Sequence, residues 1–412
     1  MLVGARRFLL LICIVLVAGC AGPAAKHESV ADPVILISID GFRADYLDRG
    51  RTPTLASLAA SGVRADALKP SFPTLTFPNH YTLVTGLYPD HHGIVDNRMI
   101  DPAIDHMFVY KDSKAIADPA WWRGEPLWVG VENSGRHAAT MFWPGTNVAI
   151  DGVRPSHWIE FNGKVSPERR VDQLLAWFDL RGARKPAFYT LYFEQVDHAG
   201  HDYGPDSPEV DAALREVDAA LARLVAGLEA RGAFARTNLV IVSDHGMTST
   251  SPERVIYLDD LIPLDDAGLV TSGILAGMNP KPDRASGIES VLLAKHDHMR
   301  CWRKSEIPAR FHYGTNPRVP ALLCLADDGW LVSTREAVKN RKHFSLGEHG
   351  YDNDDPAMRA LFVAHGPALK SGVRVRELDN VDVYPLVAHL LALPPRHVDG
   401  RYEDVREMLV DP

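Results

Sequence analysis

Cysteine is scarce in this chain. Only four cysteines occur among 412 residues, and two of them, Cys13 and Cys20, fall within the first twenty positions. Cys301 and Cys324 are the two that remain, so we expect one disulfide at most beyond this segment. That bond would form in an oxidising compartment; two free, buried cysteines are the alternative that the sequence leaves open.

Positive charge is also in short supply. The chain holds 44 Lys and Arg against 53 Asp and Glu, which gives a formal net charge of −9. Proteins bind long nucleic acid through many contacts between basic side chains and phosphates, so we expect no long nucleic acid as a partner. An anionic substrate must instead be attracted locally, and bound metal ions are one means of attracting it.

The apolar run nearest the N-terminus is too short to span a bilayer. It covers Phe8–Val17 and follows Arg6 and Arg7, a pattern typical of an export signal. Val17-Ala18-Gly19-Cys20 resembles a bacterial lipobox, in which the cysteine becomes the lipid-modified first residue. We therefore expect a signal peptide over residues 1–19, a lipid anchor at Cys20, a tether over residues 20–32 and a periplasmic location. Ordinary signal cleavage near the same position is the alternative.

Three apolar, β-branched runs lead into acidic residues. They cover residues 33–39, 187–193 and 238–243, and continuous runs of this kind are typical of strands buried on both faces of a parallel sheet. Asp40, Asp197 and Asp244 follow these runs in that order. Ligands of open α/β sheets bind at the carboxyl ends of the strands, so we expect the three side chains to meet there.

Helical periodicity separates the runs. Ser207-Pro208-Glu209 is a typical helix start, apolar residues then recur at spacings of three and four as far as Leu228, and Gly232 ends the pattern. Shorter helices are expected over residues 53–60, 172–180 and 381–393. The alternation predicts an α/β fold with a doubly wound, mostly parallel sheet and helices on both faces.

Residues 251–342 depart from this alternation. They contain many Pro and Gly residues and separate His245 from His349, which we expect at one site. We therefore expect an inserted cap over 251–342, with a catalytic core formed by residues 33–250 and 343–412. The sequence does not specify the oligomeric state.

Three short motifs combine acidic residues, histidine and glycine. They are Asp197-His198-Ala199-Gly200-His201, Ser243-Asp244-His245-Gly246 and Gly347-Glu348-His349-Gly350. Together with Asp40 they offer three aspartates and three histidines, a donor set that suits two zinc ions. One such motif alone is more often a hydrogen-bonded turn, but this combination fits a single site far better than separate accidents.

Thr76, in Thr76-Phe77-Pro78-Asn79-His80, is a candidate nucleophile. A helix is expected from Pro78 to Thr85, which would put Thr76 at a helix N-terminus, where backbone N–H groups and the dipole favour phosphate. A threonine hydroxyl is barely ionised at neutral pH and needs a metal to activate it. A plain helix cap is the alternative for this residue.

Further motifs, in chain order, resemble the nucleotide pyrophosphatase/phosphodiesterase family of the alkaline phosphatase superfamily. They are Asp40-Gly41-Phe42-Arg43, Pro73-Thr74-Leu75-Thr76-Phe77-Pro78-Asn79-His80-Tyr81, Thr85-Gly86-Leu87-Tyr88-Pro89, His92-Gly93-Ile94, Gly124-Glu125-Pro126-Leu127-Trp128 and Trp143-Pro144-Gly145. With the three acidic and histidine motifs, the resemblance covers nearly all of the chain after residue 32.

The resemblance implies a role for each matching residue. One zinc ion would be held by Asp197, His201 and His349, and the other by Asp40, Asp244 and His245. Thr76 would lie beside the second zinc ion and form a phospho-threonine intermediate, and Asn97 would donate a hydrogen bond to a phosphate oxygen. Phe77 and Tyr192 would stack on a nucleobase.

The resemblance also implies the reaction. Nucleoside 5′-phosphodiesters and nucleoside triphosphates would be hydrolysed at the α-phosphorus to nucleoside monophosphates. A lysophospholipid-type diester, a phosphate monoester and a phosphonate stay open as substrates, with Arg98 or Arg123 as a possible grip for a monoester. Sulfatase activity is rejected because Thr76 and His80 replace the Cys or Ser and the Arg of that maturation signal. A non-catalytic binding protein is disfavoured by the intact set of metal ligands.

Overall fold

The structure is a computed structural model that describes residues 32–411. The expected signal peptide, the lipid anchor at Cys20 and the tether up to residue 31 lie outside the described residues. Within the part that is described, no helix combines the length and the apolar character needed to cross a membrane.

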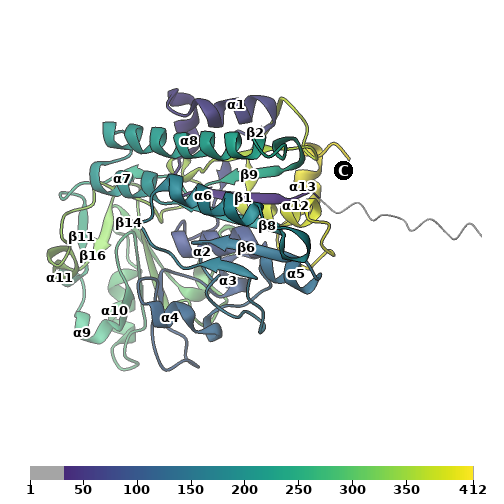
Figure 1. The fold of residues 1–412 in the computed structure, drawn as a ribbon. Helices are drawn as coiled ribbons and strands as arrows, with labels where there is room; N and C mark the ends of the chain where they lie inside the picture. Colours follow the sequence, from purple (N-terminus) through teal and green to yellow (C-terminus); the bar gives the residue numbers. More distant parts are fainter. Residues whose placement is uncertain (1–31, 412) are drawn as a thin grey trace, which may run out of the picture. The chain divides into compact units, whose positions relative to one another are not determined.

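A mostly parallel sheet of eight strands forms the centre of the described chain (Figure 1). Its order is β19-β2-β18-β9-β1-β8-β6-β7. The strands are β1 (Val34–Ile39), β2 (Val63–Ala65), β6 (His137–Met141), β7 (His157–Ile159), β8 (Pro186–Phe193), β9 (Asn238–Val242), β18 (Phe362–His365) and β19 (Val373–Val375). Only β18 runs antiparallel to its neighbours, so the expected α/β class and mostly parallel sheet are confirmed.

The three apolar runs form adjacent strands at the middle of this sheet. β1 pairs in parallel with β8, and also with β9 on its other side. Val34 lies opposite Phe188 in one pair and opposite Asn238 in the other. The three strands therefore end at the same edge, as buried parallel strands require.

Two apolar layers cover the faces of the sheet, and the residues of β1 alternate between them. Ile35, Ile37 and Ile39 pack with α1 (Pro53–Ser61), α6 (Pro167–Phe178) and α8 (Pro208–Glu229). Val34 and Leu36 face α2 (Thr76–Thr85), α5 (Leu127–Asn133) and α12 (Val383–Leu390). Figure 1 shows α1 and α8 along one side of the sheet, with α2 and α3 (Pro89–His92) on the other.

The predicted helices occur where they were expected, but some of their predicted ends differ from the observed ones by several residues. The longest helix begins at Pro208 behind the Ser207 cap, as expected. The helix expected over 172–180 begins five residues earlier, because Ser166-Pro167 already provides a start. The helix expected over 381–393 is a 3₁₀ turn, Asn380–Asp382, followed by α12, whose first turn accommodates Pro385.

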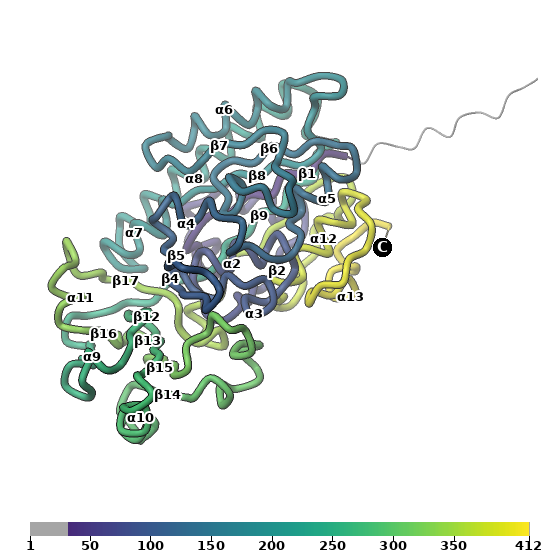
Figure 2. Tube along the Cα trace, turned by 90° about the horizontal axis from the view of Figure 1, so that it is seen from below, coloured from purple at the N-terminus to yellow at the C-terminus, as the bar shows by residue number. Residues whose placement is uncertain are grey.

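A second, antiparallel sheet lies within residues 251–342, the segment that we propose to treat as the inserted cap. Its order is β12-β13-β15-β14, with β12 (Leu269–Thr271), β13 (Leu275–Met278), β14 (Met299–Arg303) and β15 (Leu322–Ala326). Figure 2 shows these strands together with α9 (Leu264–Ala267), α10 (Ala285–Leu292) and α11 (Arg335–Lys339), apart from α12 and α13 (Tyr402–Val405).

Shorter elements complete the described chain. They are β3 (Leu68–Lys69), β4 (Arg98–Met99), β5 (Phe108–Val109), β10 (Thr248–Ser249), β11 (Val255–Tyr257), β16 (Leu331–Ser333), β17 (Gly347–Glu348), β20 (Leu378–Asp379), α4 (Ser113–Ala117) and α7 (Gln195–Tyr203).

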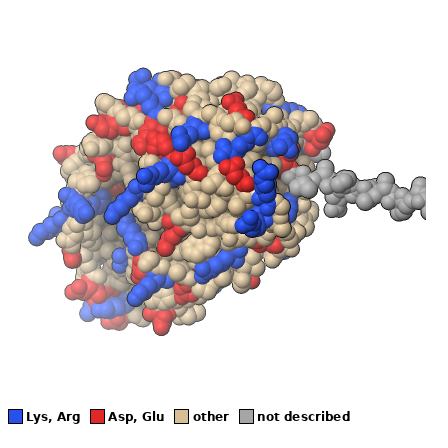
Figure 3. Space-filling model, viewed as in Figure 1, with Lys and Arg blue, Asp and Glu red and all other residues tan. Residues whose placement is uncertain are grey.

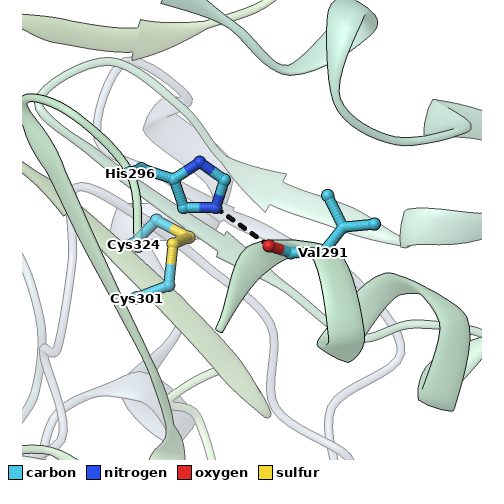
Figure 4. The surroundings of a disulfide bond; sticks show 4 residues. All are labelled: Val291, His296, Cys301 and Cys324. Carbon is cyan, nitrogen blue, oxygen red and sulfur yellow. Dashed lines mark hydrogen bonds between the residues drawn. A yellow bond between two sulfur atoms is a disulfide. The ribbon is translucent and has the colours of Figure 1, made fainter. Parts of the chain in front are cut away.

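A disulfide joins two strands of the antiparallel sheet. Cys301 on β14 lies opposite Cys324 on β15, and their sulfur atoms are bonded (Figure 4). Nearby, the His296 ring contacts the carbonyl of Val291 at 2.9 Å. The structure thus selects the disulfide over two free cysteines, and disulfides are typical of compartments outside the cytosol.

The Ser207 cap gives a test of the fold. The Ser207 hydroxyl accepts a hydrogen bond of 3.2 Å from the Val210 backbone N–H. We expect Ser207→Ala to lower the free energy of unfolding by about 1 kcal/mol, since that N–H loses its partner. Urea unfolding would show this as a lower midpoint at an unchanged slope. Ser207→Asp, which can still cap, should unfold like the parent; equal midpoints for all three proteins would contradict the capping role.

Candidate active site

Three aspartates meet at the carboxyl edge of the main sheet. Asp40 directly follows β1, Asp244 follows β9 after one residue, and Asp197 lies in the first turn of α7, which follows β8. Their residues are 1%, 0% and 8% exposed, respectively. The alignment of the three strand ends therefore places three carboxylates in one buried pocket.

Gly41 allows this close approach. Its φ is +67°, and a Cβ atom there would lie 2.9 Å from the Cα of Asp197. Any other residue would be strained by this backbone conformation and would also push α7 away from β1. The glycine after Asp40 thus lets the Asp197 segment reach the first strand.

Two overlapping groups of side chains could each hold a metal ion. In Asp40, Asp244 and His245, one ligand atom from each residue lies within 4.8 Å of the others. The His245 Nε2 atom is 3.3 Å from Asp40 Oδ1 and 3.0 Å from Asp244 Oδ2. These three residues are the set expected for one zinc ion.

The second group differs in one member from the expected set. It consists of Asp197, His349 and His245, so His245 belongs to both groups and its ring stacks on that of His349 at 3.4 Å. His201 lies at the margin, with Nε2 3.4 Å from Asp197 Oδ1 and a side chain that is 27% exposed. All six expected ligands are thus gathered, while His201 lies outside the tighter group of three.

The chemistry of these groups fits divalent cations. One oxygen each of Asp40, Asp197 and Asp244 is buried without a hydrogen-bond partner among the described residues, and an uncompensated buried charge is costly. Each histidine directs Nδ1 at a backbone carbonyl, which can only accept, so Nε2 keeps its lone pair for a metal. The pairs are His201 with Gly347 (2.7 Å), His245 with Gly246 (2.9 Å) and His349 with Thr74 (2.8 Å).

The pKa shifts of the pocket residues also favour a divalent cation at this site. Burial raises the pKa of Asp40 well above its usual range, and the nearby Asp244 and Asp197 raise it further. Burial and the neighbouring His245 lower the pKa of His349 to about 3, so its imidazole stays neutral, which is the form that binds metals. Burial raises the pKa of Asp197 and Asp244 as well, but the facing histidines outweigh it and lower both below their usual range. Asp40 is therefore the carboxylate whose charge the histidines leave uncompensated.

Thr76 lies beside this cluster. It is the first residue of α2, so the helix begins two positions earlier than expected, and its Oγ1 is 3.3 Å from His245 Nε2. Asn97 is next to it: the Asn97 Oδ1 atom accepts a hydrogen bond of 3.1 Å from the Phe77 N–H. Because the oxygen is engaged in this way, the Asn97 amide nitrogen is left to donate.

Tyr192 and His80 contact the metal-ligand cluster in ways that the sequence did not reveal. The Tyr192 hydroxyl donates to Asp40 Oδ2 at 2.6 Å. His80 is fully buried, and its Nδ1 lies 2.9 Å from the Thr76 carbonyl oxygen and 3.2 Å from Asp244 Oδ2. The contacts of Tyr192 with Asp40 and of His80 with Asp244 join residues far apart in sequence, so no local pattern predicts them.

A cavity of about 720 Å³ opens beside Thr76. Aromatic side chains form much of its lining, and they are Phe77, Tyr110, Phe142, Trp143, Phe161 and Tyr192. Phe161 is 50% exposed, and its ring centre is 5.9 Å from that of Tyr192. Sequence reasoning missed Phe161, although it follows the carboxyl end of β7, where the strand-end rule would have found it.

A second cavity, of about 790 Å³, meets the first at Asn97 and His349. Its lining includes Arg98, Lys111 and Arg341. Arg98 donates to the Val270 carbonyl at 2.9 Å and does not line the aromatic cavity. Of the described Lys and Arg side chains, only Lys111 borders the aromatic cavity.

The comparison with protein families agrees with this geometry. Residues 34–352 match the model of the family described as type I phosphodiesterase / nucleotide pyrophosphatase. The chain belongs to this family. It therefore stands among hydrolases of the phosphodiesterase and nucleotide pyrophosphatase type.

Related proteins match over most of the chain. An uncharacterised pyrophosphatase/phosphodiesterase of Schizosaccharomyces pombe is 40% identical over 382 residues, which are 90% of this chain and 79% of that protein. The bis(5′-adenosyl)-triphosphatase ENPP4 of Bos taurus is 37% identical over 98% of this chain and 88% of its own. Ectonucleotide pyrophosphatase/phosphodiesterase family member 1 of Mus musculus is 36% identical over 95% of this chain, which spans only 44% of that protein.

A solved structure shares the fold. Murine ectonucleotide pyrophosphatase / phosphodiesterase 5, as an inactive threonine-to-alanine variant in complex with AMP, superposes with a TM-score of 0.87 at 34% identity. The match covers 92% of this chain and all of that chain.

The contact between Tyr192 and Asp40 gives a test that does not depend on turnover. If Asp40 is a metal ligand, we expect Tyr192→Phe to weaken the binding of a divalent cation such as zinc by roughly 10- to 100-fold, since partners of this kind orient metal ligands. Competition with a chelator would measure the affinity. Tyr189→Phe is the matched control: Tyr189 lies on the same strand, and its buried hydroxyl has no partner within the described region. Equal zinc affinities for both variants would argue against the orienting role.

Proposed function

We propose that this protein hydrolyses nucleoside 5′-phosphodiesters and nucleoside triphosphates at the α-phosphorus and releases a nucleoside monophosphate. One observation carries the proposal: Thr76 Oγ1 lies 3.3 Å from His245 Nε2. His245 belongs to the buried cluster of aspartates and histidines, and Thr76 lines the aromatic cavity. A hydroxyl, two candidate metal sites and a flat apolar cavity together suit a nucleotide phosphoester.

Two zinc ions are the proposed cofactors. One would be held by Asp197, His201 and His349 and the other by Asp40, Asp244 and His245. Zinc is bound by carboxylate oxygen and imidazole nitrogen, which are the donors that this pocket offers. When bound, such a pair of ions lowers the pKa of a hydroxyl and stabilises charge on the attacking and leaving oxygens.

Thr76 is the proposed nucleophile. Its position at the start of α2 directs the positive end of the helix dipole at an incoming phosphate. Attack by its Oγ1 on phosphorus would expel the leaving group and form a phospho-threonine, which water then hydrolyses. The inactive relative that binds AMP carries a threonine-to-alanine change, which supports a threonine in this role.

Asn97 is proposed to hold a non-bridging phosphate oxygen. The bond from the Phe77 N–H engages the Asn97 amide oxygen, Asn97 lines the cavity, and its amide nitrogen would donate to the phosphate oxygen. An asparagine brings no charge, and Arg98 and Arg123 do not line the aromatic cavity. A phosphate monoester carries more negative charge than a diester and needs more cationic partners, and Lys111 is the one basic side chain of the described region that this cavity offers.

The base is proposed to stack against the aromatic lining. Phe77 and Phe161 offer partly exposed rings at the cavity, and stacking on aromatic faces is how proteins hold bases without reading their edges. Tyr192 also lines the cavity, but its hydroxyl is committed to Asp40. We therefore propose that Tyr192 contributes its ring to the wall while orienting the metal ligand.

A dinucleoside polyphosphate is a second candidate substrate. The aromatic cavity meets the second cavity at Asn97 and His349, so a long leaving group has space beyond the reacting phosphorus. The bovine relative is named as a bis(5′-adenosyl)-triphosphatase. A lysophospholipid diester is the rival that the substrate comparison below must exclude.

We also propose that the protein is exported and lipid-anchored. The Cys301–Cys324 disulfide suits an oxidising compartment, and Val17-Ala18-Gly19-Cys20 supports anchoring through Cys20. Intact mass measurement of the protein purified from membranes would reveal the acyl chains.

Replacement of the nucleophile gives a decisive test. We expect Thr76→Ala to lower kcat by roughly 10³-fold or more while two zinc ions per chain are retained, since the residue lost carries the covalent step. Metal content and steady-state rates would be measured on the same preparations. Thr76→Ser, which keeps a hydroxyl, should recover a large part of the activity; turnover by the alanine variant at the parent rate would refute the assignment.

Removal of Phe161 tests the base site. For thymidine 5′-p-nitrophenyl phosphate, we expect Phe161→Ala to lower kcat/KM about tenfold, in keeping with the loss of one stacking contact. Methyl p-nitrophenyl phosphate has no base and should be affected much less. Trp158→Ala removes a neighbouring exposed aromatic side chain that does not line the cavity and should behave like the parent.

The ranking of substrates checks the reaction class. The parent should prefer the thymidine diester to p-nitrophenyl phosphate and to lysophosphatidylcholine. Preference for the monoester or for the lipid would overturn the nucleotide assignment.

A further inference from the structure

Basic side chains flank the place where the chain enters the main sheet. β1 lies between β8 and β9, and the segments that precede these two strands cover residues 179–185 and 230–237. Arg181, Arg184 and Lys185 lie in the first loop, and Arg231 and Arg236 in the second. All five residues are exposed.

The strand register shows where these two loops lie relative to the start of β1. Val34 lies opposite Phe188 on one side and Asn238 on the other, and the Asn238 N–H donates to the Pro33 carbonyl at 2.9 Å. Lys185 directly precedes β8, and Arg236 ends a 3₁₀ turn two residues before Asn238, the first residue of β9. The basic side chains therefore lie on the two loops that lead into the strands on either side of β1.

Little acidic charge offsets them. Arg231 forms a bidentate pair with Asp179, with both contacts at 2.7 Å, and this pair links the two loops. Among the described residues, Arg181, Arg184, Lys185 and Arg236 form no ion pair with an acidic side chain. Asp179 is the one acidic residue within the two loops, and Glu229, at the end of α8, and Asp32, just before β1, are the acidic residues next to them in sequence. Elsewhere, acidic and basic side chains are interspersed over the face seen in Figure 3, and the whole chain carries a net charge of −9.

We propose that Arg181, Arg184, Lys185 and Arg236, here named the amino-edge rim, dock onto the anionic lipid headgroups of the membrane that holds the anchor. Anionic leaflets attract clusters of Lys and Arg close to a membrane-attached segment, and lipid chains combined with a basic patch give stable attachment. A chain of a dozen residues spans about 40 Å at most, so a lipid anchor at Cys20 would limit how far the rim can move from the bilayer. This inference rests on the proposed lipid anchor.

Docking in this way determines which substrates reach the site. Asp40, Asp197 and Asp244 lie at the carboxyl edge of the sheet, and the rim lies at the amino edge. The eight residues of β8 separate the two edges by about 26 Å, at about 3.3 Å per residue. The site then opens away from the bilayer, toward dissolved nucleotides, and lipid phosphodiesters of the same leaflet are out of reach.

Hydrogen exchange in nanodiscs tests the rim directly. The lipidated full-length protein would be placed in discs of phosphatidylcholine, or in discs with about a third of phosphatidylglycerol. In the anionic discs at low salt, we expect amides of residues 179–185 and 230–237 to exchange roughly tenfold more slowly. High salt should abolish the difference because it screens surface charge.

Charge reversal provides the matched comparison. The variant Arg184→Glu/Lys185→Glu/Arg236→Glu should lose the protection, while Lys295→Glu/Arg300→Glu, which reverses exposed charges in the cap segment, should retain it. Equal exchange in both kinds of disc, or protection of the reversed variant, would overturn the proposal. Protection by inorganic phosphate in the phosphatidylcholine discs would show that the rim is a small-anion site instead.

The anchor and the chemistry are assayed separately. Intact mass reports the acyl chains, and turnover of the thymidine diester reports the active site. A protein that carries acyl chains and is active, but shows no protection in anionic discs, would disprove rim docking while leaving the proposed function in place.

Discussion

The burial of three aspartates in one pocket is the main constraint on this molecule. Asp40, Asp197 and Asp244 share one pocket because three parallel strands end side by side. Carboxylates this close and this dry require compensating positive charge, and the surrounding groups are arranged to supply or admit it. Histidine nitrogens face the pocket, and the Tyr192 hydroxyl donates a hydrogen bond to Asp40. The fold thus creates an electrostatic demand that two divalent cations would meet.

The direction of the strands gives the two edges of the sheet opposite character. At the carboxyl edge, acidic groups lie buried below two cavities. At the amino edge, basic groups are exposed around the chain entry. Neither property follows from the net charge of −9, which averages over both. The local distribution of charge, set by the topology, is what suits one edge to metals and phosphate and the other to anionic surfaces.

The sequence identified much of this because it identified the central strands. Continuous apolar runs ending at Asp40 and Asp244 are strong local signals, and the sheet rule then placed the acidic residues together. The start of α6 and the end of α12 were misplaced by several residues because helix ends depend on turns with weak signals. Phe161 was missed since β7 is a three-residue edge strand without an apolar run. The hydrogen bond from Tyr192 to Asp40 and the pairing of Cys301 with Cys324 depend on long-range packing, which spacing alone does not encode.

His349 enters the pocket from the far end of the chain, after the whole of the 251–342 segment, whereas Asp40 directly follows the first strand. During synthesis, the aspartates therefore exist for a long interval without the residue that completes their ligand set. A chain that stops before residue 349 keeps the repulsion without the full means of relieving it. The group of Asp40, Asp244 and His245 is complete once residue 245 is made, whereas the group with Asp197 waits for His349, so the proposed metal centre would be completed in two stages along the chain.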